Sequence, residues 1–213
     1  MKNFSSEIVS IITRTLDAKP EDITDILTIR DGMTNHSYKF SCKGLSYIIR
    51  LPGEGTDLLI NRRNEADVYR IISGMGICDD PVYINSENGI KITKFIDGVR
   101  TCNPYDIDDV KKCMTKLRDF HAMSLKAEHE FDIFGQIEFY EALRKNTHSI
   151  YADYDYVKKN VFKLRSYINE NVSSRCLAHI DSVPDNFLFY TNSDGEEKLQ
   201  LTAYMIKLTL IIS

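Results

Sequence analysis

Tryptophan is absent from this 213-residue chain, and several other features are scarce. The five cysteines are scattered without a C-x-x-C spacing, so reduced thiols are expected and a zinc site is not. No apolar run reaches the roughly 18 residues of a membrane span, and Met1 to Thr15 lacks a signal-peptide pattern. The net charge of −4 argues against nucleic acid as a partner. These absences favour a soluble, cytoplasmic protein.

The composition that remains, 43% hydrophobic and 27% charged, is typical of a globular chain. Apolar spacing predicts helices at 4–16, 61–72, 106–123, 139–150 and 156–170. It predicts strands at 26–30, 37–41, 45–51, 82–84, 90–95, 175–180, 186–190 and 198–202. The fold class is therefore predicted as α+β, with a mixed sheet in a first lobe (1–96) and mostly helices in a second (97–213). The inward side of the helix at 106–123 is expected to carry Ile107, Val110, Met114, Leu117 and either Phe120 or His121.

The most distinctive local pattern is H-x-D-x-x-x-x-N, from His179 to Asn186, between two apolar segments. Phosphoryl transfer to a hydroxyl needs a carboxylate that orients the hydroxyl and accepts its proton, and oxygen ligands for magnesium. Asp181 and Asn186 have the residue types for these two tasks, on a loop that Pro184 stiffens. The alternative for the same residues is a turn that only bonds its own backbone. His179 is expected to brace the loop rather than carry a proton.

Residues 179–189 resemble the catalytic loop of the choline kinase and aminoglycoside phosphotransferase superfamily. The segment D-G-M-T-N-H-S-Y at 31–38 is similar to the G-M-T-N-x-x-Y phosphate loop of choline kinases, which is the more specific match. The two motifs occur in the family's order, and the resemblance extends to about Thr202. It implies a protein-kinase-like fold with two lobes, a β-rich first lobe with one main helix and a mostly helical, truncated second lobe. It also implies ATP and Mg²⁺ as cofactors.

The resemblance further implies nucleotide-binding roles for residues of the first lobe. Gly32 permits close backbone approach, while Thr34 and Asn35 offer donors to phosphate oxygens. Arg50 is similar in place to the strand cation that reaches the phosphates, and Glu65 to the helix acid that holds it. We expect this pair within about 4 Å of each other. From the residues alone, the glycine would be an ordinary turn residue, and both charged side chains would face solvent.

The pattern breaks after the strand predicted at 198–202. Family members have an I-D-W-E-Y type motif there, whose Asp binds magnesium, whereas Ala203 to Ser213 contains no acid. Asn186 is then the magnesium ligand that the resemblance leaves. Asp185 is a weak substitute, because neighbours in an extended segment point to opposite sides. The tail is expected to form either a last strand or a poorly packed end. A shifted reading frame, a natural short paralogue and an artificially altered chain stay open as its origin.

The predicted function is ATP-dependent phosphorylation of a small-molecule acceptor, choline or a similar amino alcohol such as ethanolamine, impaired by the missing acid. One alternative is a kinase of the same superfamily with another acceptor, such as an aminoglycoside, thiamine or a sugar. Another is a non-catalytic remnant that acts as a binding or interaction protein. Aromatic faces recognise choline-like cations, but Tyr151, Tyr154, Tyr156 and Tyr167 are expected to be half-buried packing residues. Nothing in the sequence indicates an oligomeric state.

Overall fold

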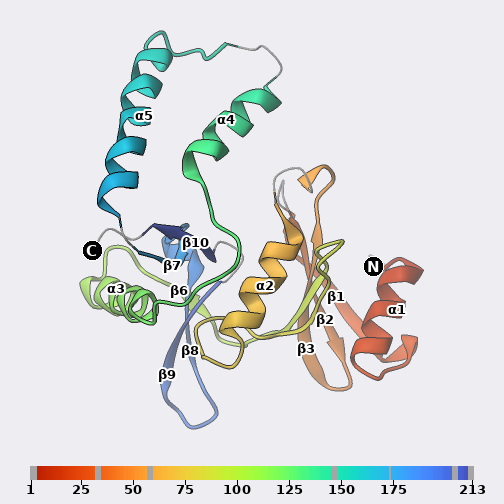
Figure 1. The fold of residues 1–213 in the computed structure, drawn as a ribbon. Helices are drawn as coiled ribbons and strands as arrows, with labels where there is room; N and C mark the ends of the chain where they lie inside the picture. Colours follow the sequence, from red (N-terminus) through yellow and green to blue (C-terminus); the bar gives the residue numbers. More distant parts are fainter. Residues whose placement is uncertain are drawn as a thin grey trace.

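The computed structural model describes residues 4–31, 35–56, 60–144, 148–172, 174–202 and 206–210. In these ranges a five-stranded sheet with two helices is followed by three helices and two small sheets (Figure 1), which confirms the α+β class. The first part consists of α1 (Ser6–Thr15), the 3-10 turn η1 (Pro20–Asp22), β1 (Ile23–Asp31), β2 (Asn35–Cys42), β3 (Leu45–Pro52), α2 (Arg62–Ile72), β4 (Pro81–Ile84) and β5 (Lys91–Lys94). The second part consists of β6 (Arg100–Thr101), α3 (Ile107–Ala122), α4 (Ile133–Leu143), α5 (Tyr154–Asn171), β7 (Arg175–His179), the 3-10 turn η3 (Pro184–Asn186), β8 (Phe187–Thr191), β9 (Glu197–Leu201) and β10 (Ile206–Leu210).

The five-stranded sheet has the order β1-β2-β3-β5-β4, and each neighbouring pair is antiparallel. The predicted turn at Lys43-Gly44 joins β2 to β3 with φ of 50° and 75°, as a two-residue hairpin requires. The expectation of a mixed sheet is wrong for the described strands. The connection through α2 leads to the edge strand β4, and β5 then returns beside β3 in the opposite direction. No parallel crossover results.

Helix α1 covers one face of this sheet (Figure 1). Ser5 caps it, because its hydroxyl accepts the backbone N–H of Ile8 at 3.3 Å. Ile11 and Ile12 are buried against apolar side chains of β2, β3, β5 and the turn before β5, namely Phe40, Cys42, Tyr47, Ile49, Ile90 and Ile92. Each such side chain contributes about 1.5–3 kcal/mol through burial. This first core fixes the sheet independently of the second half of the chain.

Helix α2 lies between the sheet and the second half of the chain (Figure 1). Asn61 caps it by accepting two backbone N–H groups of the first turn, each at 3.1 Å. Its Val68, Tyr69 and Ile72 belong to a larger second core with residues that come mostly from the second half, namely Ile77, Cys78, Cys102, Cys113, Leu117, Phe120, Leu177, Phe187, Phe189 and Leu201. The apolar side of α2 therefore packs in the second core, and the buried Arg62 and Glu65 of its first turn face the sheet, whereas Arg63 and Arg70 are exposed.

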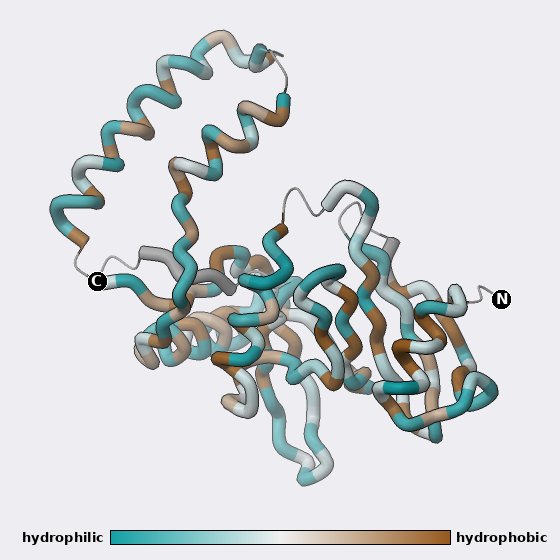
Figure 2. The backbone as a smooth tube through the Cα atoms, turned by 45° about the vertical axis from the view of Figure 1, so that its right-hand side comes forward, coloured by the Kyte–Doolittle hydropathy of each residue, from teal (hydrophilic) through white to brown (hydrophobic). Residues whose placement is uncertain are grey.

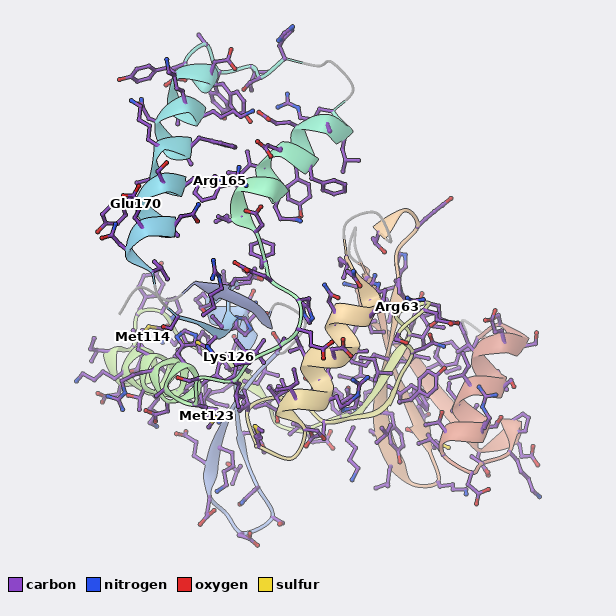
Figure 3. All side chains as sticks on the ribbon, in the orientation of Figure 1. Arg63, Met114, Met123, Lys126, Arg165 and Glu170 are labelled. Carbon is purple, nitrogen blue, oxygen red and sulfur yellow. The ribbon has the colours of Figure 1, made fainter. Side chains whose placement is uncertain are left out.

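Helix α3 has the predicted extent, and its inward side is predicted correctly in part, since Val110 packs against the second core as expected. Leu117 and Phe120 are buried as expected, whereas Ile107 is 64% exposed and Met114, labelled in Figure 3, is 48% exposed. Asp109 and Cys113 are buried on the inward side instead. The guanidinium of Arg100 holds both oxygens of Asp109 at 2.5 and 2.9 Å and so provides the buried carboxylate with a counter-ion.

Helices α4 and α5 run side by side and project from the rest of the molecule (Figures 1 and 2). The helix predicted at 139–150 lies earlier, because Asp132 caps α4 through the N–H of Phe134. Arg165 of α5 reaches Asp132 at 3.4 Å (Figure 3). Tyr154 is half-buried and donates to Glu141 at 2.8 Å. The expected packing role does not extend to three tyrosines, which are more than half exposed, namely Tyr151, Tyr156 and Tyr167.

The end of the described chain forms a strand, which was one of the two alternatives for the apolar tail. β10 pairs antiparallel with β7, and Ile206 lies opposite His179. β6, β8 and β9 form a separate three-stranded sheet in which β8 is central. Within the described ranges, none of the helices combines the length and apolarity needed to cross a membrane.

Candidate functional site

Asp181 and Asn186 meet on the loop between β7 and β8. The amide Nδ2 of Asn186 donates to the backbone carbonyl of Asp181 at 2.7 Å and to its Oδ2 at 3.0 Å. Asn186 closes the 3-10 turn that begins at Pro184, and its side chain is buried. The sequence pattern thus correctly placed both groups on one loop. The same contact would also brace a purely structural turn, so their roles depend on what surrounds the loop.

His179 braces this loop, as expected. Its Nε2 donates to the backbone carbonyl of Thr202 at 2.6 Å, and the N–H of Thr202 donates to the carbonyl of Asn186 at 3.0 Å. Burial lowers the pKa of the His179 imidazole, and the Thr202 hydrogen bond and the charge of Asp181 offset this only in part. The loop from His179 to Asn186 is therefore tied to the end of β9 by a histidine whose charged form is disfavoured by burial.

The residue that follows β6 also holds the loop. The N–H of Cys102 lies 3.3 Å from the carbonyl of Pro184 and 3.2 Å from that of Phe187, on either side of Asn186. Cys102 directly follows β6, whose Arg100 is fixed by Asp109. The position of Asn186 is thus set by β6 and α3 together as well as by its own loop.

Arg50 and Glu65 form the predicted ion pair. Nη1 of Arg50 lies 2.5 Å from Oε1 of Glu65, and both side chains are less than a tenth exposed. Nη2 of Arg50 donates to the carbonyl of Gly89 at 3.1 Å. Burial alone would lower the pKa of Arg50, but the charge and hydrogen bond of Glu65 outweigh it, and the net shift is upward. Arg50 is therefore a permanent, fixed cation at the sheet face that meets α2.

Two further cations in this layer were missed by sequence reasoning. Arg62, one turn before Glu65, donates from Nη1 to Oε2 of Glu65 at 3.2 Å. Lys91 of β5 lies opposite Arg50 of β3 in the strand register. Its Nζ lies 2.7 Å from Oδ2 of Asp79. The spacing of Arg62 and Glu65 was a usable signal, since side chains three apart meet on a helix. No such sequence signal indicated the contact of Lys91 with Asp79.

In the part of the chain that the structure describes, the layer between the sheet and α2 consequently holds three cations and two carboxylates. Arg50, Arg62 and Lys91 are buried, and Glu65 and Asp79 are their counter-ions. Among the described residues of this layer, the positive charges exceed the carboxylates by one. An excess of buried positive charge disfavours the isolated protein and favours an anionic ligand such as phosphate.

The hairpin predicted to cradle phosphate begins next to this layer. Gly32 and Thr34 lie outside the described residues. Asn35 is the first residue of β2 and pairs with Pro52, while Ser37 pairs with Arg50. The base of the 31–35 segment therefore lies beside the strand that carries the Arg50 guanidinium.

The residues present fit magnesium only in part. The side chains of Asn186 and Asp181 supply amide and carboxylate oxygens, which are ligands that Mg²⁺ accepts. Within the described part of the chain, no group of three or more His, Cys, Asp or Glu side chains could hold a metal ion. Ala203, where the resemblance expects the second acid, lies outside the described residues. These oxygens alone do not complete a magnesium site.

Comparison with known proteins gives a consistent result. A family model described as choline/ethanolamine kinase matches residues 26–204. Protein LicA of Haemophilus influenzae is 26% identical over 166 residues, which are 74% of this chain and 48% of that protein. The chain thus spans about half the length of this curated relative.

Solved structures resemble the chain over almost its whole length. The crystal structure of choline kinase LicA from Streptococcus pneumoniae has a TM-score of 0.76 and 26% identity, covering 95% of this chain and 70% of that one. A crystal structure of LicA in complex with AMP has a TM-score of 0.74 and 26% identity, covering 96% and 71%. The expected protein-kinase-like α+β fold is thereby confirmed.

Proposed function

The chain belongs to the choline/ethanolamine kinase family, and from this premise we propose that it binds ATP to phosphorylate the hydroxyl of choline or a similar small amino alcohol. The observation that carries the proposal is the buried ion pair of Arg50 and Glu65. A fixed guanidinium on β3, where Arg50 lies opposite Ser37 of β2, suits the α and β phosphates of a nucleotide. The LicA complex with AMP supports nucleotide binding by a relative of this chain.

The proposed reaction assigns one role to each group. The acceptor hydroxyl oxygen forms a bond to the γ-phosphorus, the bond from that phosphorus to the β,γ-bridging oxygen breaks, and ADP leaves. The carboxylate of Asp181 orients the hydroxyl and takes its proton. Arg50, held by Glu65, binds the phosphates. Gly32, Thr34 and Asn35 provide the phosphate loop.

Magnesium would offset charge on the phosphates when bound, and Asn186 is its proposed ligand. Asn186 is neutral and holds a divalent ion weakly by itself. We therefore propose that the 213 residues bind nucleotide but transfer phosphate slowly. We further propose that residues 1–96 act as the nucleotide-binding lobe and 97–213 as part of the catalytic lobe. The five free cysteines support a reducing compartment, namely the cytoplasm.

Two other functions have specific support. The incomplete set of magnesium ligands favours a remnant that binds nucleotide without catalysis. A different acceptor, such as an aminoglycoside, thiamine or a sugar, is compatible with the same phosphate clamp, by which we mean Arg50 held by Glu65.

Calorimetry with ADP and a choline-dependent ADP-release assay test the proposal. The unmodified chain should bind ADP, and Arg50→Met should weaken this more than tenfold, because a charge-assisted contact is lost. Lys94→Met, which removes an exposed cation from β5, should not. Choline-dependent ADP release should stay near background. Absence of ADP binding would refute the nucleotide role, and rapid choline phosphorylation would refute the impairment. Release that depends on another acceptor would reassign the substrate.

A further inference from the structure

We propose that Arg62 is a positioning residue for nucleotide phosphate: by holding the second oxygen of Glu65, it keeps Arg50 oriented for phosphate before any nucleotide arrives. This inference rests on the proposed function, because it concerns the same phosphate clamp. It adds a residue that does not itself touch the nucleotide.

The two oxygens of Glu65 are divided between two arginines. Oε1 accepts from Arg50 at 2.5 Å and Oε2 accepts from Arg62 at 3.2 Å. A carboxylate that faces a single guanidinium tends to bind it through both oxygens. Without Arg62, Glu65 would draw two N–H groups of Arg50 to itself. With Arg62 present, Arg50 gives Glu65 one N–H, and its buried Nε has no partner among the described residues.

Arg62 is itself held on two further sides. Its Nη2 donates to Oγ1 of Thr56 at 3.0 Å, and that hydroxyl donates to the carbonyl of Gly53 at 2.8 Å. Gly89 packs against its stem, since a Cβ there would lie 2.5 Å from Cδ of Arg62. The carbonyl of Gly89 in turn accepts from Arg50. Arg50, Glu65, Arg62 and Gly89 thus form a closed ring of contacts, and Thr56 with Gly53 is a side branch that holds Arg62.

The ring and its side branch link four separate segments of the chain. These are β3, the loop after it, the first turn of α2 and the turn before β5. Arg63, next in sequence, is exposed (Figure 3), so the arginine that faces inward is specifically Arg62. A ring of this kind makes the ion pair a built-in state of the apo protein, with less ordering left for the nucleotide to drive.

The test compares the affinities of the 213-residue chain for ADP and for adenosine, which lacks phosphate. Arg62→Met should lower the affinity for ADP about tenfold and leave the affinity for adenosine unchanged. Arg62→Lys keeps a charge near Glu65 and should stay within about threefold of the unmodified chain. The matched control is Arg70→Met, which breaks an exposed pair with Asp67 on the same helix and should change neither affinity.

The outcomes separate positioning from simple stability. Equal losses for ADP and adenosine in Arg62→Met would mean a structural role only, and would overturn the inference. If Arg62→Met binds ADP as tightly as the unmodified chain does, the inference is also overturned, and the proposed function stays intact. If Arg62→Met does not fold, Thr56→Val is the deciding variant: a loss of about threefold for ADP alone supports the inference, and no loss overturns it. No preference for ADP in the unmodified chain would overturn both proposals at once.

Discussion

Glu65→Gln is the substitution that tests the buried charge layer most directly. Glutamine has nearly the same shape, but its single carbonyl oxygen accepts from only one of the two arginines. Its amide N–H groups would face the other guanidinium, and two buried cations would lose their shared anion. Removing one partner of a buried ion pair costs about 3–5 kcal/mol. That is a large share of the about 5–15 kcal/mol that stabilises a typical domain.

Urea denaturation followed by circular dichroism measures this loss. With a slope of about 3 kcal/mol per molar urea for a chain of this size, the midpoint should fall by about 1–2 M. Asp67→Asn is the matched control on the same helix, because its partner Arg70 is 76% exposed and such pairs contribute about 0–1 kcal/mol. A Glu65→Gln midpoint within about 0.3 M of the unmodified chain would refute the reasoning, since a shared, buried carboxylate cannot be neutralised without cost.

Three further changes have defined outcomes. Gly89→Ala should lower the melting temperature by at least about 4 °C, because φ is +70° and the new Cβ would meet Arg62; Gly74→Ala, with open space at its Cβ position, should lose less. Burial lowers the pKa of His121 below 6.5, so the unfolded chain takes up its proton first as pH falls, and stability should drop below about pH 6.5. His121→Gln should flatten the dependence of the urea midpoint between pH 7.5 and 5.5, and an unchanged slope would exclude this histidine. Ala203→Asp should make ADP binding respond to magnesium in calorimetry, and an unaltered titration would show that the metal acid belongs elsewhere.

Most helices and strands were predictable because their signals are local. The turn at Lys43-Gly44 and the apolar spacing around it gave both strands of the hairpin that carries Arg50. The helix with Glu65 was predicted to start at Asn61, which caps it. The early start of α4 was not predicted, because apolar spacing alone does not reveal the N-cap at Asp132.

Long-range pairing set the limit of sequence reasoning. Apolar spacing on α3 predicted Ile107 and Met114 as inward, and it could not show that Arg100 and the N–H of Asn103 would stabilise a buried Asp109. Among the candidate site residues, the pairing of Arg50 with Glu65 was predictable only through the family resemblance. The spacing of Arg62 and Glu65 allowed their contact to be predicted, but not the burial of Arg62, because an arginine in a charged helix turn normally faces solvent.

The packing of α2 has a consequence for how the chain acquires its structure. Val68, Tyr69 and Ile72 pack in a core with residues that are synthesised later, such as Phe120 and Leu201. A fragment that stops at residue 96 would display these side chains to water and should self-associate. The nascent sheet with α1 has its own core and can form early. The apolar side of helix α2 is fully packed only after the second half has been synthesised. We therefore expect the phosphate clamp to be completed late in synthesis.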